Sequence, residues 1–208
     1  MSVGLHQKFD LEALNGMERR FRATLINSLP GVKCLQLIGS QSEQGVLNLA
    51  PFNSIVHIGA NPGLLGFILR PTTVDRHTWN NIEASGFFTL NAVTERLRDA
   101  AHQSSAKYDA ETSEFEAVGL TPHFEEDFSA PYVLESPVKV GLQFEEDHMI
   151  EANGTRLVVG RVVEILLPPG HPREDGFLDP HILGLIGVCG LDSYHAAGAG
   201  VQREYARP

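Results

Sequence analysis

The chain has 208 residues, of which 42% are hydrophobic, and its formal net charge at pH 7 is -10. A chain of this length and apolar content can bury one sizeable core, so we expect a single domain over residues 1–208. The acidic balance argues against nucleic-acid and membrane partners, because phosphate backbones and anionic lipids attract clusters of cationic side chains.

No stretch of the sequence has the pattern of a targeting or membrane segment. Residues 1–10 lack an apolar run after a positive region, and no window approaches the roughly 18 to 20 apolar residues that span a bilayer. Cys34 and Cys189 each lie in an apolar run, which favours reduced, buried thiols over a disulfide framework. These features predict a cytoplasmic protein.

Strand patterns outnumber helix patterns in the first third of the chain. Residues 10–21 have helical apolar spacing, with Asp10 placed as an N-cap, and this helix is expected to pack one face on the body. β-branched and aromatic residues between Gly, Pro and Ser then predict a meander of strands over residues 32–40, 46–58 and 64–69.

A mixed region follows the meander. Residues 78–85 predict a short helix ending at Gly86, and a strand over 87–92 and a helix over 95–103 come next. These helices are too short to form a layer of their own. We expect them to lie at the periphery of the strands.

The C-terminal third contains a β-hairpin. Strands over residues 138–149 and 155–167 are joined through Asn153-Gly154, a pair that tolerates the positive φ angles of a type I′ turn. The proline-rich and glycine-rich segment 168–180 is expected to be an exposed loop. The whole pattern is typical of an antiparallel β-barrel with peripheral helices.

The most informative part of the sequence is a polar stretch between residues 48 and 82. Arg70 and Arg76 can neutralise a phosphate dianion with forked hydrogen bonds, and amide and hydroxyl side chains supply donors and acceptors. None of these residues is an obvious acid–base catalyst, so we interpret the stretch as a binding site whose chemistry comes from its ligand. The uncharged polar residues are Asn48, Ser54, Asn61, Thr72, Thr78 and Asn81.

The order of motifs along the chain resembles the flavin reductase-like family, whose members have an FMN-binding split barrel. The resemblance covers most of the chain, and it implies a mainly β fold: a six-stranded antiparallel Greek-key barrel with peripheral α-helices. It also implies a homodimer with FMN at the subunit interface. The motifs are Asn48-Leu49-Ala50-Pro51-Phe52, Asn61-Pro62, Arg76-His77-Thr78 with Asn81-Ile82, and the segments 102–106, 114–122, 130–131 and 135–137.

The resemblance implies a role for each part of the polar stretch. The phosphate would lie near Arg76 and Thr78, beside the free amides of the helix over 78–85, with Arg70, His77 and Asn81 nearby. The isoalloxazine ring would be lined by Asn48, Leu49, Ala50, Pro51, Phe52, Asn53 and Ser54, with Asn61 as a further cofactor-binding residue. From the residues alone, a solvent-facing strand and a solvated helix cap remain the alternatives.

This chain departs from the family pattern at two places. Relatives commonly carry Lys-Asp-Thr where this chain has Arg76-His77-Thr78, and Ser where it has Asn53. The cation and the hydroxyl are retained. The role of His77 is left open.

Two further segments are candidates for the cofactor site. Ser104, Ser105 and Ala106 match a segment that approaches the ribityl-phosphate end of the flavin in the family, although a polar surface loop is the alternative. Tyr194 could stack on the flavin, from either subunit, although Asp192 could instead cap the start of a helix.

Other catalytic classes have little support. The nine histidines lack the spacing of a metal site, Gly198-Ala199-Gly200 lacks the strand and helix of a dinucleotide fingerprint, and no nucleophile motif is present. We therefore expect no metal and no catalytic side chain of the protein's own.

The resulting hypothesis is an FMN-dependent oxidoreductase. NAD(P)H would deliver hydride to flavin N5, and free flavin, a ferric chelate or another small-molecule redox partner would receive the electrons. Because no clear adenine or ribose site is visible, an FMN-binding carrier or sensor with little NAD(P)H reactivity is the alternative. A third possibility is another planar ligand such as a deazaflavin or a haem, for which His57 is the candidate axial ligand.

Overall fold

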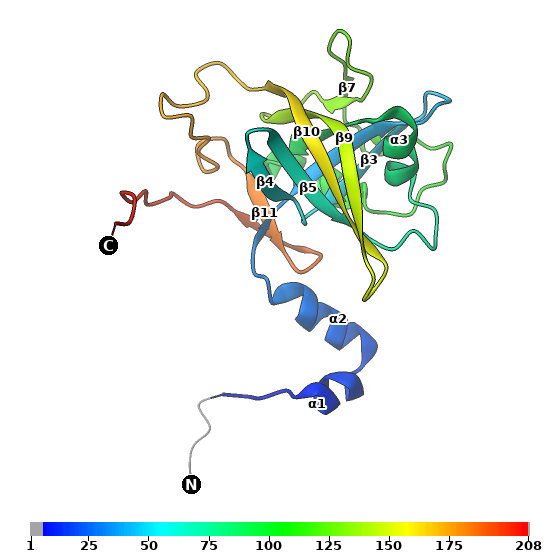
Figure 1. Ribbon diagram of the computed structural model, residues 1–208, viewed down its shortest axis with the longest axis vertical. Helices are drawn as coiled ribbons and strands as arrows, with labels where there is room; N and C mark the ends of the chain where they lie inside the picture. Colours follow the sequence, from blue (N-terminus) through cyan, green and yellow to red (C-terminus); the bar gives the residue numbers. More distant parts are fainter. Residues whose placement is uncertain (1–5, 208) are drawn as a thin grey trace.

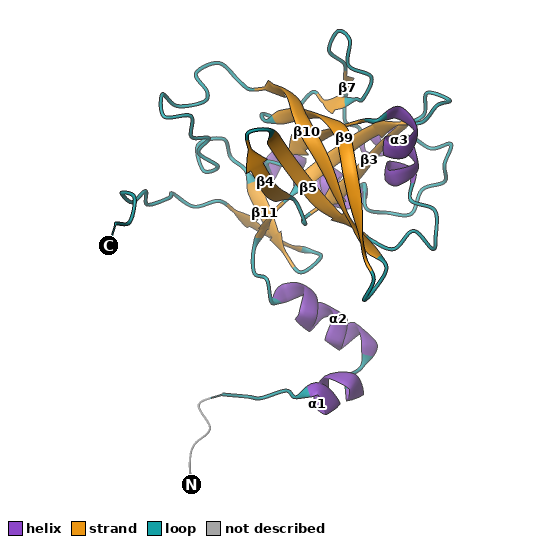
Figure 2. Ribbon diagram, in the orientation of Figure 1, coloured by secondary structure: helices purple, strands orange, loops and turns teal. Residues whose placement is uncertain are grey.

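The computed structural model describes residues 6–207 and consists of a β-barrel with short helices at its periphery and two N-terminal helices that stand apart (Figures 1 and 2). The described strands are β1 (Lys33–Cys34), β2 (Gln36–Gln41), β3 (Leu47–Phe52), β4 (Val56–Ala60), β5 (Gly63–Leu69), β6 (Phe87–Ala92), β7 (Pro122–His123), β8 (Tyr132–Val133), β9 (Lys139–Ile150), β10 (Thr155–Leu166), β11 (Ile186–Cys189) and β12 (Ser193–Ala196). The helices are α1 (Leu11–Gly16), α2 (Arg19–Ser28), α3 (His77–Ser85), the 3-10 turn η1 (Glu95–Leu97), α4 (Arg98–Gln103) and α5 (Glu114–Val118).

The barrel is one antiparallel sheet of seven strands in the order β3-β2-β6-β9-β10-β5-β4. β3 and β4 lie at the two ends of this order, yet only residues 53–55 separate them in the chain. The sheet must therefore curl until its ends meet at this bend. With the bent β3–β4 segment counted as one strand, the barrel has the six strands that the family resemblance implies, and the expected mainly β, split-barrel class is confirmed.

Two apolar clusters lie on either side of β2. Ile38 belongs to the cluster inside the barrel, together with Phe67 and Phe88. Leu37 belongs to an outer cluster that α4, α5 and β11 cover. Because neighbouring residues of a strand face opposite sides, β2 is buried on both faces, and the four successive residues 37–40 are all buried.

A glycine allows the inner cluster to close. Gly160 on β10 lies where an added Cβ would be 2.6 Å from the ring of Phe88. A side chain there would collide with an aromatic ring that is itself buried. The absence of a side chain at this position is therefore part of the packing.

Several predicted elements are confirmed, and two are subdivided. Helix α3, the left-handed Gly86 that ends it (φ 75°) and strand β6 lie where the sequence placed them. The predicted strand over 46–58 is broken at residues 53–55, and the one over 32–40 is broken at Leu35. These breaks arise from long-range contacts that local residue patterns do not encode.

The hairpin of β9 and β10 is confirmed, but its turn is not type I′. Thr155 pairs with Ile150, so residues 151–154 form the connection. Gly154 has a φ of 73°, whereas Asn153 is not among the residues with positive φ. The Asn153 side chain instead accepts hydrogen bonds from the backbone N–H (3.1 Å) and hydroxyl (2.7 Å) of Thr155.

The N-terminal helix prediction was wrong in extent and in packing. Asp10 caps α1 as expected, accepting the N–H of Ala13 at 2.9 Å. A second helix then begins because the Glu18 carboxylate accepts the N–H groups of Arg20 and Phe21. Neither α1 nor α2 has a buried residue, so no helix face packs on the body as expected. The end of α2 does reach the body, where the Cys189 thiol lies 3.7 Å from the Ser28 carbonyl.

Two other expectations need correction near the C-terminal hairpin. Residues 193–196 form strand β12 rather than a helix capped by Asp192. Both cysteines are free, as expected, but Cys34 is exposed and Cys189 is half-buried. Leu35, the apolar residue next to Cys34, is buried in the outer cluster, whereas Cys34 itself is not part of that cluster.

Candidate functional site

A buried polar network joins β2, β3 and α3. The side-chain amides of Asn48 and Asn81 both donate to the hydroxyl of Ser40, at 3.3 and 3.1 Å. Asn48 also donates to the hydroxyl of Thr78, at 3.0 Å. All four side chains are buried. The network therefore fixes the first turns of α3 beside β3, which brings together the two regions that the sequence assigned to opposite ends of FMN.

The N-terminus of α3 has free hydrogen-bond donors. Arg76 occupies the cap position without a side-chain cap hydrogen bond, so no side chain satisfies the first amides of the helix. The Arg76 guanidinium lies half-buried beside them, where its Nε donates to the Pro71 carbonyl at 3.2 Å. Its other nitrogens keep their donors, and this combination of amides and a cation suits a phosphate.

Among the strands of residues 6–207, β3 pairs with β2 alone, so its other edge has no strand partner there. On the free edge the N–H of Leu49 donates to the carboxylate of Glu114 at 3.0 Å. N–H groups of a strand alternate in direction, so Pro51 occupies the next outward position and has no N–H to offer. Carbonyl groups of β3 on this edge remain available to a ligand.

Glu114 was missed by the sequence reasoning, although its segment 114–122 contributed to the family resemblance. It is buried at the start of α5, and α5 packs against β3. Burial raises the pKa of its carboxyl, while the Leu49 N–H and the nearby His77 act to lower it. A single acidic residue ahead of a short helix gives no sequence signal for this contact across 65 residues.

The end of β3 is held by two polar contacts to distant parts of the chain. Asn53 donates its side-chain amide to the Gly190 carbonyl at 3.0 Å. The Ser54 hydroxyl donates to the Ile68 carbonyl and accepts the Ile68 N–H, both at 3.1 Å. Ser54 thereby substitutes for a strand partner where β3 bends into β4. Ser54 thus helps to close the barrel, and Asn53 ties the end of β3 to the connection between β11 and β12.

The apolar residues predicted to line the ring differ in how much of their surface is exposed to solvent. Leu49 is fully buried in the outer cluster, whereas Ala50, Pro51 and Phe52 are partly exposed. Phe52 packs edge-on against Phe67, with ring centroids 4.9 Å apart. Apolar cover for a flat ligand is therefore available along residues 50–52 and absent at Leu49.

Asn61 and Arg70 lie at opposite ends of β5. Asn61 is exposed in the turn between β4 and β5, and Arg70 is exposed just after β5. A strand of this length spans roughly 20 Å, so one chain does not bring Asn61 together with the α3 N-terminus. Arg70 precedes the loop 71–76 that leads to α3, and it stays near the predicted phosphate end.

The segment after α4 reaches the same region, since α4 packs against both β3 and α5. Ser104 is buried and donates to the Ala101 carbonyl at 3.0 Å. Ser105 is exposed and donates to the His102 carbonyl at 2.6 Å, and Ala106 is also exposed. Ser105 and Ala106 are the members of this segment that a ligand can reach.

Tyr194 lies on β12 and contacts α4. Its hydroxyl is 2.7 Å from Nδ1 of His102, and the two rings pack edge to face at 5.8 Å. Burial raises the pKa of the Tyr194 hydroxyl, and the carboxylate of Asp192 adds to the effect. In this chain Tyr194 joins the C-terminal hairpin to α4.

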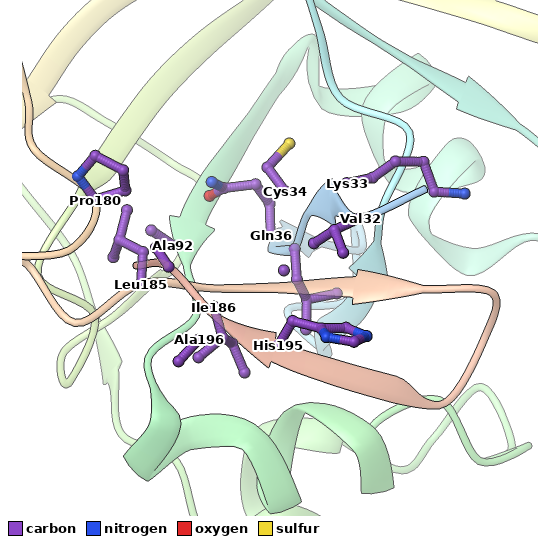
Figure 3. Close-up of a pocket in the computed structure, with 13 residues that line it drawn as sticks. Val32, Lys33, Cys34, Gln36, Ala92, Pro180, Leu185, Ile186, His195 and Ala196 are labelled. Atoms are coloured by element: carbon purple, nitrogen blue, oxygen red, sulfur yellow. The ribbon is translucent and has the colours of Figure 1, made fainter. Parts of the chain in front are cut away.

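A pocket of about 210 Å³ lies beside the bend at the end of β3 (Figure 3). Its wall is mostly apolar and comes from residues 32–36, the end of β6, the segment 180–187 and residues 195–197. The polar lining residues are Lys33, Cys34, Gln36 and His195. Gln36 pairs with Phe52, and the Cys34 sulfur is 3.8 Å from the Ile55 carbonyl. No predicted site residue lines this pocket, but it adjoins β3, the strand that carries five of them.

Residues 6–207 contain neither a cluster of metal-ligating side chains nor a membrane-spanning helix. No group of three or more His, Cys, Asp or Glu side chains is placed to hold a metal ion. Among the helices of the same part of the chain, none is both long and apolar enough to cross a bilayer.

Comparison with solved structures agrees with this architecture. A crystal structure of a split-barrel protein from Shewanella frigidimarina NCIMB 400, described as a candidate flavin reductase, is 41% identical with a TM-score of 0.93, covering 97% of this chain and 100% of that one. Nitrilotriacetate monooxygenase component B from Bacillus cereus is 21% identical with a TM-score of 0.83, covering 95% and 98%. An FMN-binding protein from Thermus thermophilus is 18% identical with a TM-score of 0.72, covering 85% and 92%.

The sequence comparison establishes the family. Residues 35–183 match the flavin reductase like domain. The chain matches 65% and 53% of the lengths of two curated relatives, at 30% and 27% identity. Its fold is therefore a split barrel, and the chain belongs to the flavin reductase like domain family.

Proposed function

We propose that this protein binds FMN and works as an NAD(P)H-dependent flavin oxidoreductase. The observation that carries the proposal is the network of Ser40, Asn48, Thr78 and Asn81, which sets an uncapped helix N-terminus beside an open strand edge. The N-terminus of α3 provides a cation and hydrogen-bond donors, and the neighbouring edge of β3 provides apolar groups. A phosphorylated flat cofactor requires both surfaces. Membership of the flavin reductase like domain family supports a flavin as that cofactor.

The phosphate is assigned to the start of α3. Arg76 supplies charge and forked donors, and the free amides of the first helical turn point at the same place. We assign His77, Arg70 and Ser105 to this corner as further contacts. Thr78 and Asn81 are committed to the buried network, so we assign them to positioning the helix.

The isoalloxazine ring is assigned to the free edge of β3. Its polar edge would meet backbone groups between residues 48 and 54, while Pro51 and Phe52 would cover its apolar end. Glu114 keeps this strand in place through the Leu49 N–H. When bound, FMN would supply the redox chemistry by accepting hydride from NADH or NADPH and passing electrons to free flavin, a ferric chelate or another small acceptor.

The protein's own part in the reaction is to bind, orient and give access. No side chain at the site needs to carry a proton in this scheme. The pocket beside the β3 bend is the place where a small redox partner could approach the ring. We propose a cytoplasmic location, where such partners are found.

A homodimer with FMN at the subunit interface is part of the proposal. Apolar side chains are exposed on the outer face of β4 and β10, which are neighbours of β5 in the sheet. Such a face is typical of a subunit interface. The exposed residues are Val56, Ile58, Val163 and Ile165. A second subunit there could also bring its Asn61 or Tyr194 toward the ring.

One observation favours a second candidate function, an FMN-binding electron carrier or sensor. The pocket beside β3 has a volume of about 210 Å³, which is small for a dinucleotide. A protein with such a pocket could hold FMN yet react poorly with NAD(P)H.

An absorption experiment tests these proposals. The purified protein is mixed with FMN, freed of excess, and its visible spectrum is recorded before and after anaerobic addition of NADH or NADPH. We expect a retained two-band flavin spectrum that bleaches with one of the nucleotides. Retained colour without bleaching would identify the carrier, and failure to retain flavin would refute both candidates.

A further inference from the structure

We propose that the N-terminal arm, defined as residues 9–32, lies on a second copy of this chain and forms part of a reciprocal dimer contact. The inference rests on the homodimer of the proposed function and goes beyond it, because it assigns the contact to a segment outside the matched domain of residues 35–183. Figure 1 shows α1 and α2 standing away from the barrel of their own chain.

The arm exposes apolar side chains that its own chain leaves uncovered. The exposed fractions are 73% for Leu11, 57% for Phe21, 47% for Ile26 and 69% for Leu29. On α2, Phe21, Leu25 and Leu29 follow one another at intervals of four residues, so they form one stripe along the helix and its end. A stripe of this kind normally packs against another surface.

The two helices of the arm are joined into one unit. The Arg22 guanidinium on α2 donates to the carbonyls of Leu14 and Asn15 at the end of α1, at 3.3 and 3.2 Å. Helices of this length are marginally stable in water unless one face is packed. The arm therefore needs a packing surface, and α1 does not provide one that covers the stripe.

Charge identifies a second copy as the occupant. Residues 1–32 contain Lys8 and three arginines against three carboxylates, a net charge of +1. Since the chain totals -10, residues 33–208 carry -11. The arginines Arg19, Arg20 and Arg22 all lie on α2, so the helix with the apolar stripe is also the cationic one, and the barrel of another copy is a strongly acidic surface with exposed apolar groups.

Symmetry makes such a contact self-limiting. If the arm of one copy lies on the barrel of the other, a twofold axis places the second arm on the first barrel, and the assembly closes at two copies. Each copy then contributes one arm and one receiving surface. No unpaired apolar stripe is left to recruit a third chain.

Photo-crosslinking provides a direct test. Phe21 on the stripe is replaced by p-benzoylphenylalanine, and Ala23, which lies on the opposite side of α2, is replaced in the same way as the control. After irradiation of dilute full-length protein, we expect a covalent dimer from the Phe21 position and little from the Ala23 position. Peptide mapping should place the crosslink between the arm and a residue of the 33–208 region of the other copy.

The outcomes separate this inference from the homodimer itself. A protein that sediments as a dimer but gives no covalent dimer from the Phe21 position, or gives crosslinks within one chain, would overturn the arm contact and leave the homodimer standing. A monomer in sedimentation would refute both. Equal crosslinking from the Phe21 and Ala23 positions would show that the stripe has no specific role.

A second pair of variants measures the strength of the contact. Phe21→Ser should raise the dimer dissociation constant by about tenfold or more, since a large apolar side chain loses its burial. Ala23→Ser should change the constant by less than about twofold. An unchanged constant for Phe21→Ser would contradict the proposal, and circular dichroism of the barrel confirms that both variants are folded.

Discussion

Ser40 accepts hydrogen bonds from two buried amides, and this single hydroxyl holds β3 and α3 at a fixed distance. A buried donor that loses its acceptor has given up its hydrogen bonds to water without replacing them, and this destabilises the folded state. The site is therefore sensitive to a residue that no ligand touches. Its neighbours in sequence, Gly39 and Gln41, give no hint of this role.

Ser40→Ala is expected to lower the free energy of unfolding by about 1–3 kcal/mol, because the side-chain amides of Asn48 and Asn81 lose their acceptor. Urea denaturation measures the change. Ser129→Ala, at an exposed position, is the control and should leave the midpoint nearly unchanged. A loss in the control as large as in the Ser40 variant would show that the buried network is not responsible.

Arg76→Ala is expected to weaken FMN binding by roughly tenfold to a hundredfold, because charge-assisted hydrogen bonds to phosphate are lost. The free energy of unfolding should change by no more than about 1 kcal/mol, since only the bond to Pro71 disappears. Fluorescence titration with FMN measures the affinity. Arg96→Ala, an exposed arginine on η1, is the matched control, and equal affinities would remove Arg76 from the site.

Glu114 should make stability depend on pH. Burial raises the pKa of its carboxyl in the folded state, so the native protein binds more protons than the unfolded chain between the ordinary pKa and the raised one. Stability should therefore fall as pH rises through this window. Glu114→Gln, whose amide oxygen can still accept the Leu49 N–H, should lose that part of the slope.

Unfolding free energies of the parent and of Glu114→Gln, measured from acidic to neutral pH, give the comparison. The exposed Glu116→Gln on the same helix is the control. Parallel curves for the parent and the Glu114 variant would mean that the carboxyl titrates normally. The FMN affinity of the same samples would show whether the position of β3 depends on this contact.

At the scale of single elements, the packing of the strands depends on glycine positions, where a side chain is absent, as well as on the side chains that fill the core. β10 passes the Phe88 ring at Gly160 so closely that a Cβ would lie 2.6 Å from it. Since the ring is buried among β-strands, it has little room to move. The tight approach lets the inner cluster fill the barrel.

Gly160→Ala should therefore destabilise the barrel by about 1–3 kcal/mol through overpacking. Thermal unfolding followed by circular dichroism measures the effect. Gly198→Ala is the control, because nothing lies within 4 Å of a Cβ there. A Gly160 variant as stable as the control would show that Phe88 relaxes without cost.

Local sequence patterns predicted the helices and strands that are determined by nearby residues. Helix α3 and its Gly86 end, strand β6 and the β9–β10 hairpin were predicted from spacing and turn residues, and all are present. The bend after β3 was not predicted, because it depends on Ser54 reaching Ile68 and Asn53 reaching Gly190. The break between α1 and α2 depends on Glu18 acting as a cap in a sequence that otherwise continues a helix.

At the scale of the whole molecule, the candidate site is assembled from segments that are distant in sequence. The motifs on β3 and before α3 could be named from the sequence, because polar residues and arginines stand out between strands. Ser40 and Glu114 could not, because their importance comes from partners 41 and 65 residues away. The pocket beside β3 was also missed, since its wall combines residues 32–36 with the last part of the chain.

The free edge of β3 carries a risk that the placement of Pro51 reduces. An open strand edge can recruit a strand from another molecule and start aggregation. Leu49 directs its outward N–H to Glu114, and Pro51 has none, so two successive positions offer no donor to an incoming chain. The edge can accept a small ligand while it resists strand addition. The proposed ligand edge can therefore stay open without recruiting a strand from another copy.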